Sequence, residues 1–380
     1  MKVGIITILK VNNYGAELQA YAIQAALKKL GYEAEIIDYL FYKNPNHKPT
    51  RRSRPMFSHS LVVKVKERLY PIIERLRSAR NKKSQQLRKQ RFEMFHRDNT
   101  SMSITYHTID ELYAAKMDYD VYLTGSDQVW NPNIYSSLDP YFLDFAPKES
   151  KRISYAASFG VTEIPDYAKA YYRKQLLNYS VIGVREKSAV NIVKAIAGKD
   201  AEWVLDPTLL LSQEEWQKIS RPCHINGEYI LIYELTPCSY IRQLAEHFHQ
   251  EKGWKMVRVC KNAIPEEKDG AILNITDAGP AEFLSLVANA TLVVTNSFHG
   301  TAFSVNFNRD FYTILPMRKQ NNSRQRSLLE MFGLTERLLV EGAPMPNASS
   351  MTIDHTTVSL CLSNERRKSI NFLKQAIDEK

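Results

Sequence analysis

Short apolar runs alternate along the chain with segments of helical period. In the first part of the sequence such runs predict strands, each leading into a polar loop, at 3–8, 34–38, 120–124, 152–156, 181–186 and 202–205. Amphipathic stretches at 16–30, which Gly31 ends, at 166–179 and from 188 onward predict the helices between them. Buried apolar runs joined by helices are typical of a parallel sheet.

The same alternation begins again after residue 213. Strands are expected at 229–235, 255–260, 271–275, 292–295 and 311–315, and helices at 239–252, 280–290, 323–332 and 364–377. A chain of 380 residues is too long for one ordinary core. We therefore predict an α/β protein with two Rossmann-like, doubly wound domains, 1–210 and 211–345, that face a cleft. Residues 346–380 would add a terminal helix that packs back on the first domain.

A basic insertion at about 41–103 interrupts this pattern. Between Lys48 and Arg91 the sequence has fifteen Lys or Arg and two Glu, so this segment carries more than the net charge of +10 of the whole chain. Apolar residues fall on one helical stripe within it: Leu61, Val62, Val65, Leu69, Ile72, Ile73 and Leu76. Such a basic amphipathic helix suits a face packed on its own domain, a membrane-surface contact or a nucleic-acid arm. No nucleic-acid motif accompanies it, so we expect no nucleic-acid partner.

Cysteine spacing and the length of the apolar runs exclude further classes of protein. The four cysteines, at 223, 238, 260 and 361, form no C-x-x-C pair, so we expect neither a metal site nor disulfides. No apolar run approaches the ~20 residues that cross a bilayer, and the apolar start at 3–8 is too short for a signal peptide. We expect a cytoplasmic protein, with peripheral contact at the inner face of the membrane through residues 60–91.

Candidate chemistry gathers in polar loops that follow predicted strands. The stretch Asn296-Ser297-Phe298-His299-Gly300-Thr301 follows the run 292–295 and leads into a helix. In an open α/β sheet ligands bind at the carboxyl ends of the strands, where the next helix offers N–H groups to an anion. A simpler explanation is that Ser297 caps the helix and His299 only begins it.

Five motifs in order carry a family resemblance: Asn13-Tyr14-Gly15 with Leu18-Gln19, Gly125-Ser126-Asp127-Gln128-Val129-Trp130-Asn131-Pro132, Ser154-Tyr155-Ala156-Ala157-Ser158, Asp206-Pro207-Thr208, and Ser297-Phe298-His299-Gly300. Together they resemble the polysaccharide pyruvyl transferase family from the first strand to about residue 326. The resemblance implies a GT-B-like fold and transfer of the pyruvyl group of phosphoenolpyruvate to two sugar hydroxyls, which gives a ketal. It also implies no redox cofactor, an acceptor that is a polymeric or lipid-linked surface glycan, and His299 as the catalytic proton donor.

The residues fit this chemistry. A phosphoenolpyruvate site needs cations and N–H donors, for which we select Arg185, Ser297, Gly300, Thr301, Lys319 and Arg324. Structural alternatives remain for the cations: Arg185 could pair with Glu186, Arg324 could be an ordinary first-turn residue of a helix, and Lys319 could be a solvated loop charge. For the acceptor we select Asn13, Tyr14, Ser126, Asp127, Gln128, Trp130, Asn131 and Ser158. Carboxylates and amides bind sugar hydroxyls, and an indole can stack on the apolar face of a sugar ring.

The predicted function is therefore pyruvyl transfer in surface or exopolysaccharide biosynthesis, with phosphoenolpyruvate as a substrate and no cofactor. Two alternatives keep the same fold. One is a nucleotide-sugar glycosyltransferase, and the other is a non-catalytic glycan-binding protein.

Overall fold

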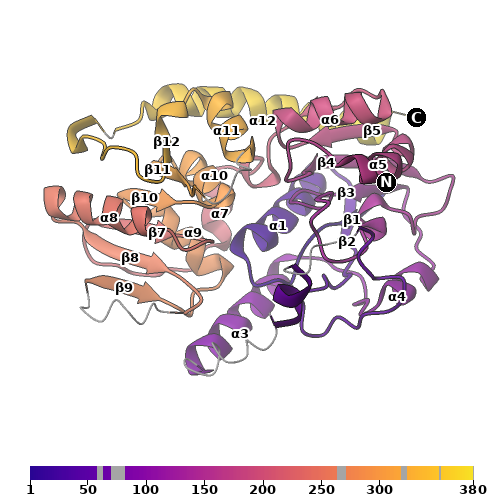
Figure 1. Cartoon of the computed structure of the whole chain (residues 1–380), viewed down its shortest axis with the longest axis horizontal. Coiled ribbons are helices and arrows are strands. Elements are labelled where there is room, and N and C mark those ends of the chain that lie inside the picture. Colours follow the sequence, from indigo (N-terminus) through magenta and orange to yellow (C-terminus); the bar gives the residue numbers. More distant parts are fainter. Residues whose placement is uncertain (58–62, 70–81, 263–270, 318–322, 351, 380) are drawn as a thin grey trace. The chain divides into compact units, whose positions relative to one another are not determined.

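The computed structural model describes residues 1–57, 63–69, 82–262, 271–317, 323–350 and 352–379. The chain forms two compact units. Unit 1 comprises residues 1–72, 96–210 and 365–380, and unit 2 comprises residues 73–95 and 211–364. Each unit is built around its own parallel sheet (Figure 1).

The sheet of unit 1 has the strand order β2-β1-β3-β4-β5-β6, and all its neighbours pair in parallel. The strands are β1 (Lys2–Ile6), β2 (Glu33–Ile36), β3 (Val121–Thr124), β4 (Lys151–Ala157), β5 (Val181–Val184) and β6 (Glu202–Trp203). The helices are α1 (Tyr14–Lys29), α4 (Ile109–Ala114), α5 (Asp166–Leu177) and α6 (Lys187–Ala197), with 3₁₀ helices η1 (Asp139–Phe142) and η2 (Pro207–Leu209).

The sheet of unit 2 is also parallel, with the order β12-β11-β10-β7-β8-β9. Its strands are β7 (Tyr229–Tyr233), β8 (Lys255–Val259), β9 (Ile272–Ile275), β10 (Leu292–Thr295), β11 (Asp310–Leu315) and β12 (Leu338–Val340). Its helices are α7 (Gln213–Ile219), α8 (Ser239–Lys252), α9 (Pro280–Ala288), α10 (Phe298–Asn306) and α11 (Ser323–Phe332), with η3 (Thr335–Arg337) and η4 (Ala348–Ser350). This is the strand order of the dinucleotide-binding Rossmann fold.

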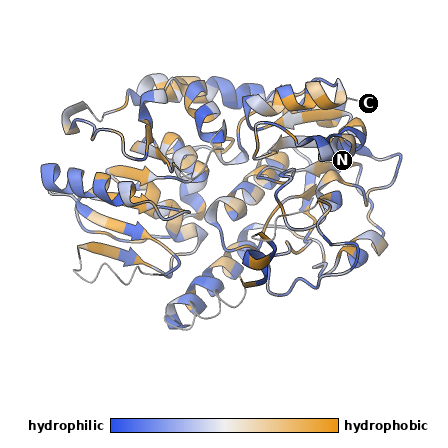
Figure 2. Cartoon of the chain, viewed as in Figure 1, coloured by the Kyte–Doolittle hydropathy of each residue, from blue (hydrophilic) through white to orange (hydrophobic). Residues whose placement is uncertain are grey.

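Burial explains why the apolar runs become strands. Every residue of β3, β7 and β10 is buried, as expected where helices cover both faces of a parallel sheet. The hydropathy colouring shows these strands as mostly hydrophobic segments (Figure 2). The predicted fold class, two Rossmann-like, doubly wound α/β domains, is confirmed by the two parallel sheets.

Several elements differ from the sequence-based expectations. The last helix, α12 (His355–Asp378), begins well before the predicted residue 364. Helix α3 (Lys82–Asn99), α4, α7 and β12 were not predicted. Residues 63–69 are helical, which includes Val65 and Leu69 of the predicted apolar stripe. The other residues of that stripe, Leu61, Val62, Ile72, Ile73 and Leu76, lie outside the described residues.

Helix α3 is mostly hydrophilic (Figure 2), yet two of its arginines make contacts inside unit 2. Arg88 is buried, and its Nη1 donates to the carbonyl of Ala278 at 3.1 Å. Arg91 forms ion pairs with Asp277 at 3.0 Å and with Glu282 at 3.6 Å. Part of the basic segment thus packs on its own unit.

The second half of α12 belongs to unit 1. The Oγ of Ser369 accepts from the backbone N–H of Leu205 at 3.0 Å, and Asp378 accepts from the hydroxyl of Tyr32 at 2.6 Å. A Cβ added at Gly183 of β5 would lie 2.6 Å from the ring of Phe372, so the helix approaches the sheet closely at a glycine.

Candidate functional site

The two sheets each have a point where the strand order reverses, and several of the predicted site residues lie there. In unit 1 the reversal lies between β1 and β3, followed by residues 7–13 and 125–131. In unit 2 it lies between β7 and β10, followed by residues 234–238 and 296–297. Rossmann-like folds bind ligands outside the carboxyl ends of the strands at such points.

The loop after β1 is held by a buried carboxylate. Glu17 in the first turn of α1 accepts hydrogen bonds from the backbone N–H groups of Lys10 and Val11, both at 2.9 Å. Its Oε2 also lies 2.8 Å from Nε2 of His96. These contacts hold a loop with two left-handed residues, Lys10 and Asn12. Glu17 was missed in the sequence because its position looked like an ordinary first-turn acid.

Asn13 and Tyr14 end this loop. The Oδ1 of Asn13 caps α1 by accepting from the N–H groups of Gly15 and Ala16, at 3.0 and 3.4 Å. Asn13 is half-buried, whereas Tyr14 is buried. Of the two residues predicted to bind the acceptor, Asn13 therefore has the more accessible side chain.

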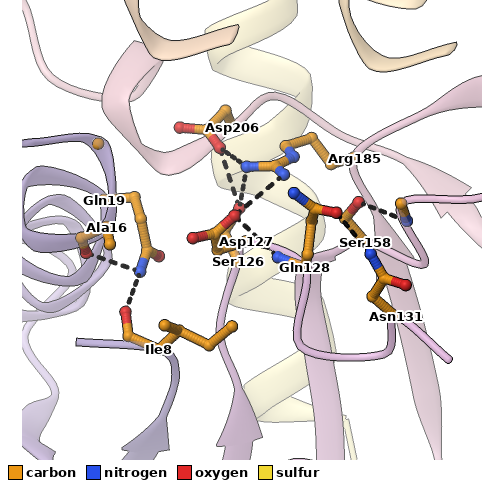
Figure 3. A network of polar contacts seen from close by, with 12 residues as sticks. Ile8, Ala16, Gln19, Ser126, Asp127, Gln128, Asn131, Ser158, Arg185 and Asp206 are labelled. Atoms are coloured by element: carbon orange, nitrogen blue, oxygen red, sulfur yellow. Dashed lines mark hydrogen bonds and ion pairs between the residues drawn. The ribbon is translucent and has the colours of Figure 1, made fainter. Parts of the chain in front are cut away.

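A polar network joins the loops at this edge of the sheet (Figure 3). Gln19 of α1 donates through Nε2 to Oγ1 of Thr7 at 2.9 Å, and Thr7 donates to the carbonyl of Ser126 at 2.8 Å. The hydroxyl of Ser126 donates to Oδ2 of Asp206 at 2.9 Å. Because Gln19, Thr7, Ser126 and Asp206 are all buried, the network fixes the loop that follows β3.

Arg185, at the end of β5, lies at the centre of this network. Its side chain is 1% exposed, and its Nη1 donates to Oδ2 of Asp206 at 2.9 Å. Its Nη2 lies 3.5 Å from Oδ1 of Asp127. Burial lowers the pKa of the guanidinium, but the carboxylates of Asp206, Asp127 and Glu186 outweigh this and raise the pKa above its ordinary value. The guanidinium is therefore held by carboxylates of its own unit.

Asp127 combines an unusual backbone with a partly exposed carboxylate. Its φ of 73° lies in the left-handed region, which is uncommon for a residue other than glycine. Its Oδ1 accepts from the N–H of Gln128 at 2.8 Å, and its carbonyl accepts from the N–H of Ser158 at 3.0 Å. The side chain is 18% exposed. Strain of this kind persists where surrounding contacts enforce it, and it is frequent at ligand sites.

Gln128 and Asn131 lie beside Asp127 and are both half-buried. The Nδ2 of Asn131 donates to Oε1 of Gln128 at 2.6 Å (Figure 3). A Cβ on Gly160 would lie 2.3 Å from that oxygen and 2.7 Å from Nδ2 of Asn131, and the φ of Gly160 is 60°. Glycine is therefore required for the two amides to approach this backbone.

Two of the predicted acceptor residues are fully buried serines that support the loops. Ser126 binds Asp206, and the hydroxyl of Ser158 donates to Oε1 of Glu186 at 2.9 Å. Glu186 is itself buried and also accepts from the N–H of Phe159 at 3.1 Å. Both serines have 0% exposure, so neither has an atom on the surface in this structure.

The prediction that Trp130 stacks on a sugar is wrong in this structure. The indole is 0% exposed and packs against Phe142, Phe159 and Tyr179, with ring centroids 5.2–5.4 Å apart. Its Nε1 donates to the carbonyl of Tyr141 at 3.1 Å. The indole is therefore enclosed by the core of unit 1.

In unit 2 the turn before α10 is closed by its own side chains. Ser297 is the N-cap, and its Oγ accepts from the N–H of Gly300 at 3.2 Å. The hydroxyl of Thr301 lies 2.7 Å from that of Thr313 and 3.1 Å from the carbonyl of Ser297. A Cβ on Gly300 would lie 2.5 Å from Oγ1 of Thr295. The hydroxyls of Ser297 and Thr301 and the N–H of Gly300 thus have partners within the turn or on β11, and their contact with the donor stays a prediction.

His299 occupies the first turn of α10 and is 6% exposed, with its ring edge-on to Phe298 at 5.2 Å. Asn296, the first residue after the predicted strand 292–295, was not selected as a site residue in the sequence. Its Oδ1 accepts from the N–H of Leu235 at 2.8 Å, and its Nδ2 donates to the carbonyl of Thr236 at 2.7 Å. Asn296 therefore ties the loop after β7 to the turn that carries His299, across the reversal point of the sheet.

Helix α11 also reaches this turn. The Nε2 of Gln325 donates to the carbonyl of Asn296 at 3.4 Å. The first turn of α11, which carries the half-buried Arg324, therefore lies against the segment that precedes His299. Lys319, the other cation predicted in this region, lies outside the described residues.

An ion pair between a buried arginine and a half-buried glutamate supports the loop after β7. Arg258 of β8 is 2% exposed, and its Nε lies 3.5 Å from Oε1 of Glu234. Oε2 of Glu234 accepts from the N–H of Cys238 at 3.3 Å. Neither residue was selected in the sequence, where Arg258 reads as one charge within an apolar strand.

No group of three or more His, Cys, Asp or Glu side chains in the described part of the chain could hold a metal ion. None of the described helices is both long and apolar enough to cross a bilayer.

Solved structures that the chain resembles include an epimerase and a heptosyltransferase. The UDP-GlcNAc 2-epimerase of Methanocaldococcus jannaschii matches with a TM-score of 0.48 and 11% identity, over 100% of this chain and 94% of that chain. The heptosyltransferase WaaC of E. coli, solved with ADP, matches with a TM-score of 0.41 and 11% identity, over 98% of this chain and 100% of that one. None of the curated proteins compared with the sequence matches it.

The sequence profile described as polysaccharide pyruvyl transferase matches residues 13–315. The match begins at the N-cap of α1 and ends with β11, so it contains all five motifs and the reversal point of the second sheet. It covers well over half of the chain, and the chain belongs to the polysaccharide pyruvyl transferase family.

Proposed function

We propose that the protein transfers the pyruvyl group of phosphoenolpyruvate to two hydroxyls of a sugar in surface or exopolysaccharide biosynthesis. In this reaction the methylene carbon of the donor gains a proton and becomes a methyl group. Two acceptor oxygens form bonds to the central carbon, and the bond from that carbon to the phosphate oxygen breaks. One acceptor proton leaves with inorganic phosphate, and the other balances the proton taken up by carbon.

The observation that carries the proposal is the turn Ser297–Gly300 at the reversal point of the second sheet. Protonation of the donor carbon creates an oxocarbenium-like centre, so the reaction needs a general acid. Histidine is suited to this because its unperturbed pKa lies closest to neutral pH, and a placed general acid typically contributes about 10²–10⁴ in rate. We assign this role to His299, which the N-cap and Asn296 hold in place.

The donor carries a phosphate and a carboxylate, so its site needs positive charge and N–H donors. Arg324 is on the helix whose first turn touches the backbone of Asn296, which supports its role as a donor ligand. The start of α10 adds the partial positive charge of a helix N-terminus. Lys319 is proposed as a second cation from the sequence alone.

The acceptor is proposed to bind at the reversal point of the first sheet. Asn13, Asp127, Gln128 and Asn131 are the predicted acceptor residues with partly exposed side chains. Amide and carboxylate groups without an excess of positive charge suit the hydroxyls of a neutral sugar better than they suit a phosphate. Contact of the basic segment with anionic membrane, where a lipid-linked acceptor would reside, completes the proposal.

Phosphate release tests the proposal. The protein is incubated with phosphoenolpyruvate in D₂O with a panel of acceptor glycosides. We expect acceptor-dependent phosphate release and one deuterium in each ketal methyl group. Thermal-shift titrations with phosphoenolpyruvate and with UDP add an independent readout, because a ligand that binds only the folded protein raises its stability. Stabilisation by UDP alone would favour glycosyl transfer, and sugar binding without turnover would favour a non-catalytic protein.

A further inference from the structure

The polar network of unit 1 contains one guanidinium and three carboxylates. Arg185 lies among Asp127, Glu186 and Asp206, and each carboxylate raises the pKa of the guanidinium. A donor with two anionic groups that approached Arg185 would meet this excess of negative charge. It would also have to displace Asp206, which binds the guanidinium at 2.9 Å where both side chains are at most 1% exposed. The network is therefore poorly suited to an anion.

The three carboxylates differ in what they can still bind. Asp206 accepts from Ser126, from Arg185 and from both the N–H and the hydroxyl of Thr208, and it is 0% exposed in its side chain. Glu186 is fully buried. Asp127 alone of the three is partly exposed, at 18%. Its Oδ1 faces Arg185 and the N–H of Gln128, while its Oδ2 has no hydrogen-bond donor among the residues that the structure describes.

We infer that Arg185 is a positioning residue that orients Asp127 toward an acceptor hydroxyl and does not bind phosphoenolpyruvate. Oδ1 of Asp127 forms an ion pair with Nη2 of Arg185 at 3.5 Å and accepts a hydrogen bond from the backbone N–H of Gln128 at 2.8 Å, so Oδ2 is left to accept a hydrogen bond from the sugar (Figure 3). The left-handed backbone of Asp127 and the bond from Ser158 N–H to its carbonyl fix the same orientation. The inference rests on the proposed function for the identity of the ligand as a sugar.

A positioning role of Arg185 and donor binding by Arg185 predict different ligand affinities for a variant that lacks both Arg185 and Asp127. If Arg185 acts through Asp127, then its loss adds nothing once Asp127 no longer carries a carboxylate. If Arg185 binds the donor, its replacement weakens phosphoenolpyruvate binding whatever residue stands at 127. A double-mutant cycle separates these two cases, since residues that act as one unit show non-additive effects.

The cycle uses Arg185→Lys, Asp127→Asn and the double variant. Lysine keeps the buried positive charge but cannot make the two-pronged contact to Asp206 and Asp127. The matched control is Arg152→Lys, which alters another buried arginine of unit 1 whose Nη2 donates to the carbonyls of Ala146 and Pro147 at 2.8 and 3.2 Å. Sugar affinity is measured by NMR with a panel of methyl hexopyranosides and no donor, and donor affinity by thermal shift with phosphoenolpyruvate.

We expect Asp127→Asn and Arg185→Lys each to weaken sugar binding about tenfold or more, the effect of losing a hydrogen bond to a charged group. The double variant should bind sugar as Asp127→Asn does, and phosphoenolpyruvate affinity should stay unchanged in all variants and in the control. Weaker phosphoenolpyruvate binding in Arg185→Lys and in the double variant, or unchanged sugar binding in both single variants, would overturn the inference. Because the sugar is measured without the donor, the expected pattern can hold even where the protein releases no phosphate, an outcome that would contradict the proposed function alone.

Discussion

Replacing Gly300 by alanine should destabilise unit 2, although the same change in most helices is stabilising. Alanine usually gains about 1 kcal/mol over glycine within a helix. Here the added Cβ would lie 2.5 Å from Oγ1 of Thr295 and 3.1 Å from its Cβ and Cγ2. Thr295 is buried, and its Oγ1 both donates to the carbonyl of Tyr233 and accepts from the N–H of Ser297. The threonine therefore has little freedom to move aside.

The expected size follows from these opposing terms. Overpacking of a buried site costs about 1–3 kcal/mol. Because the overlap is with a buried, hydrogen-bonded threonine at 2.5 Å, we expect the upper part of this range, about 2–3 kcal/mol, which leaves a net loss of about 1–2 kcal/mol after the gain in helix propensity. For a unit of this size the melting temperature should fall by about 2–8 °C. Relief of the overlap would move the start of α10, and His299 with it. A misplacement of about 1 Å can reduce a rate about 100-fold. We therefore expect the activation free energy of the reaction to rise by more than the free energy of unfolding falls.

Calorimetry and phosphate-release kinetics on Gly300→Ala measure both effects. The companion variant is Thr295→Ala, alone and combined with Gly300→Ala. If the overlap with Thr295 is the cause, Gly300→Ala costs about 1 kcal/mol less in the Thr295→Ala background than in the wild type. An unchanged or higher melting temperature for Gly300→Ala, or strict additivity of the two changes, would refute the steric reasoning.

Three further predictions concern other parts of the chain. Asn296→Ala removes both hydrogen bonds to the loop after β7 and should lower kcat/KM about tenfold. The control is Asn289→Ala in the same unit, and equal activity of the two variants would count against a positioning role for Asn296. Burial raises the pKa of Tyr141, Tyr155 and Tyr172 well above the ordinary value of 10, so the stability that their neutral hydroxyls contribute is complete below pH 10 and is lost as pH rises above it. Their ultraviolet titration should therefore coincide with unfolding, and ionisation of all tyrosines in the folded protein would contradict this. Vesicles that contain anionic lipid should co-sediment the protein at low salt and release it at high salt, and indifference to anionic lipid would end the membrane proposal.

The sequence predicted correctly those helices and strands whose own pattern of apolar and polar residues agrees with which residues are buried in the structure. The run Leu292–Thr295 is apolar and fully buried, and Ser297 is the N-cap that its position before the helix indicated. Helix α3 was missed because its sequence is strongly polar, and its contacts to Ala278, Asp277 and Glu282 lie far away along the chain. Such contacts leave no periodic signal in the segment itself.

The candidate site shows the same division. The motifs placed Asp127 and His299 at the carboxyl ends of strands, because strand and loop are adjacent in sequence. The partners of Arg185 could not be predicted, because Asp206 and Asp127 are distant from it in sequence and come close to it only when the strands pair in the sheet. The indole of Trp130 was assigned to a sugar from its polar neighbours, whereas its burial depends on aromatic residues from three other segments.

The central claim is that His299 supplies the proton that activates phosphoenolpyruvate. The most direct measurement is acceptor-dependent phosphate release by His299→Asn, compared with the wild type and with His247→Asn, a histidine of α8 that contacts the carbonyl of Pro346. The account predicts a fall in kcat of about 10²–10⁴ for His299→Asn, unchanged stabilisation by phosphoenolpyruvate, and wild-type rates for His247→Asn. Full activity of the His299→Asn protein would contradict it.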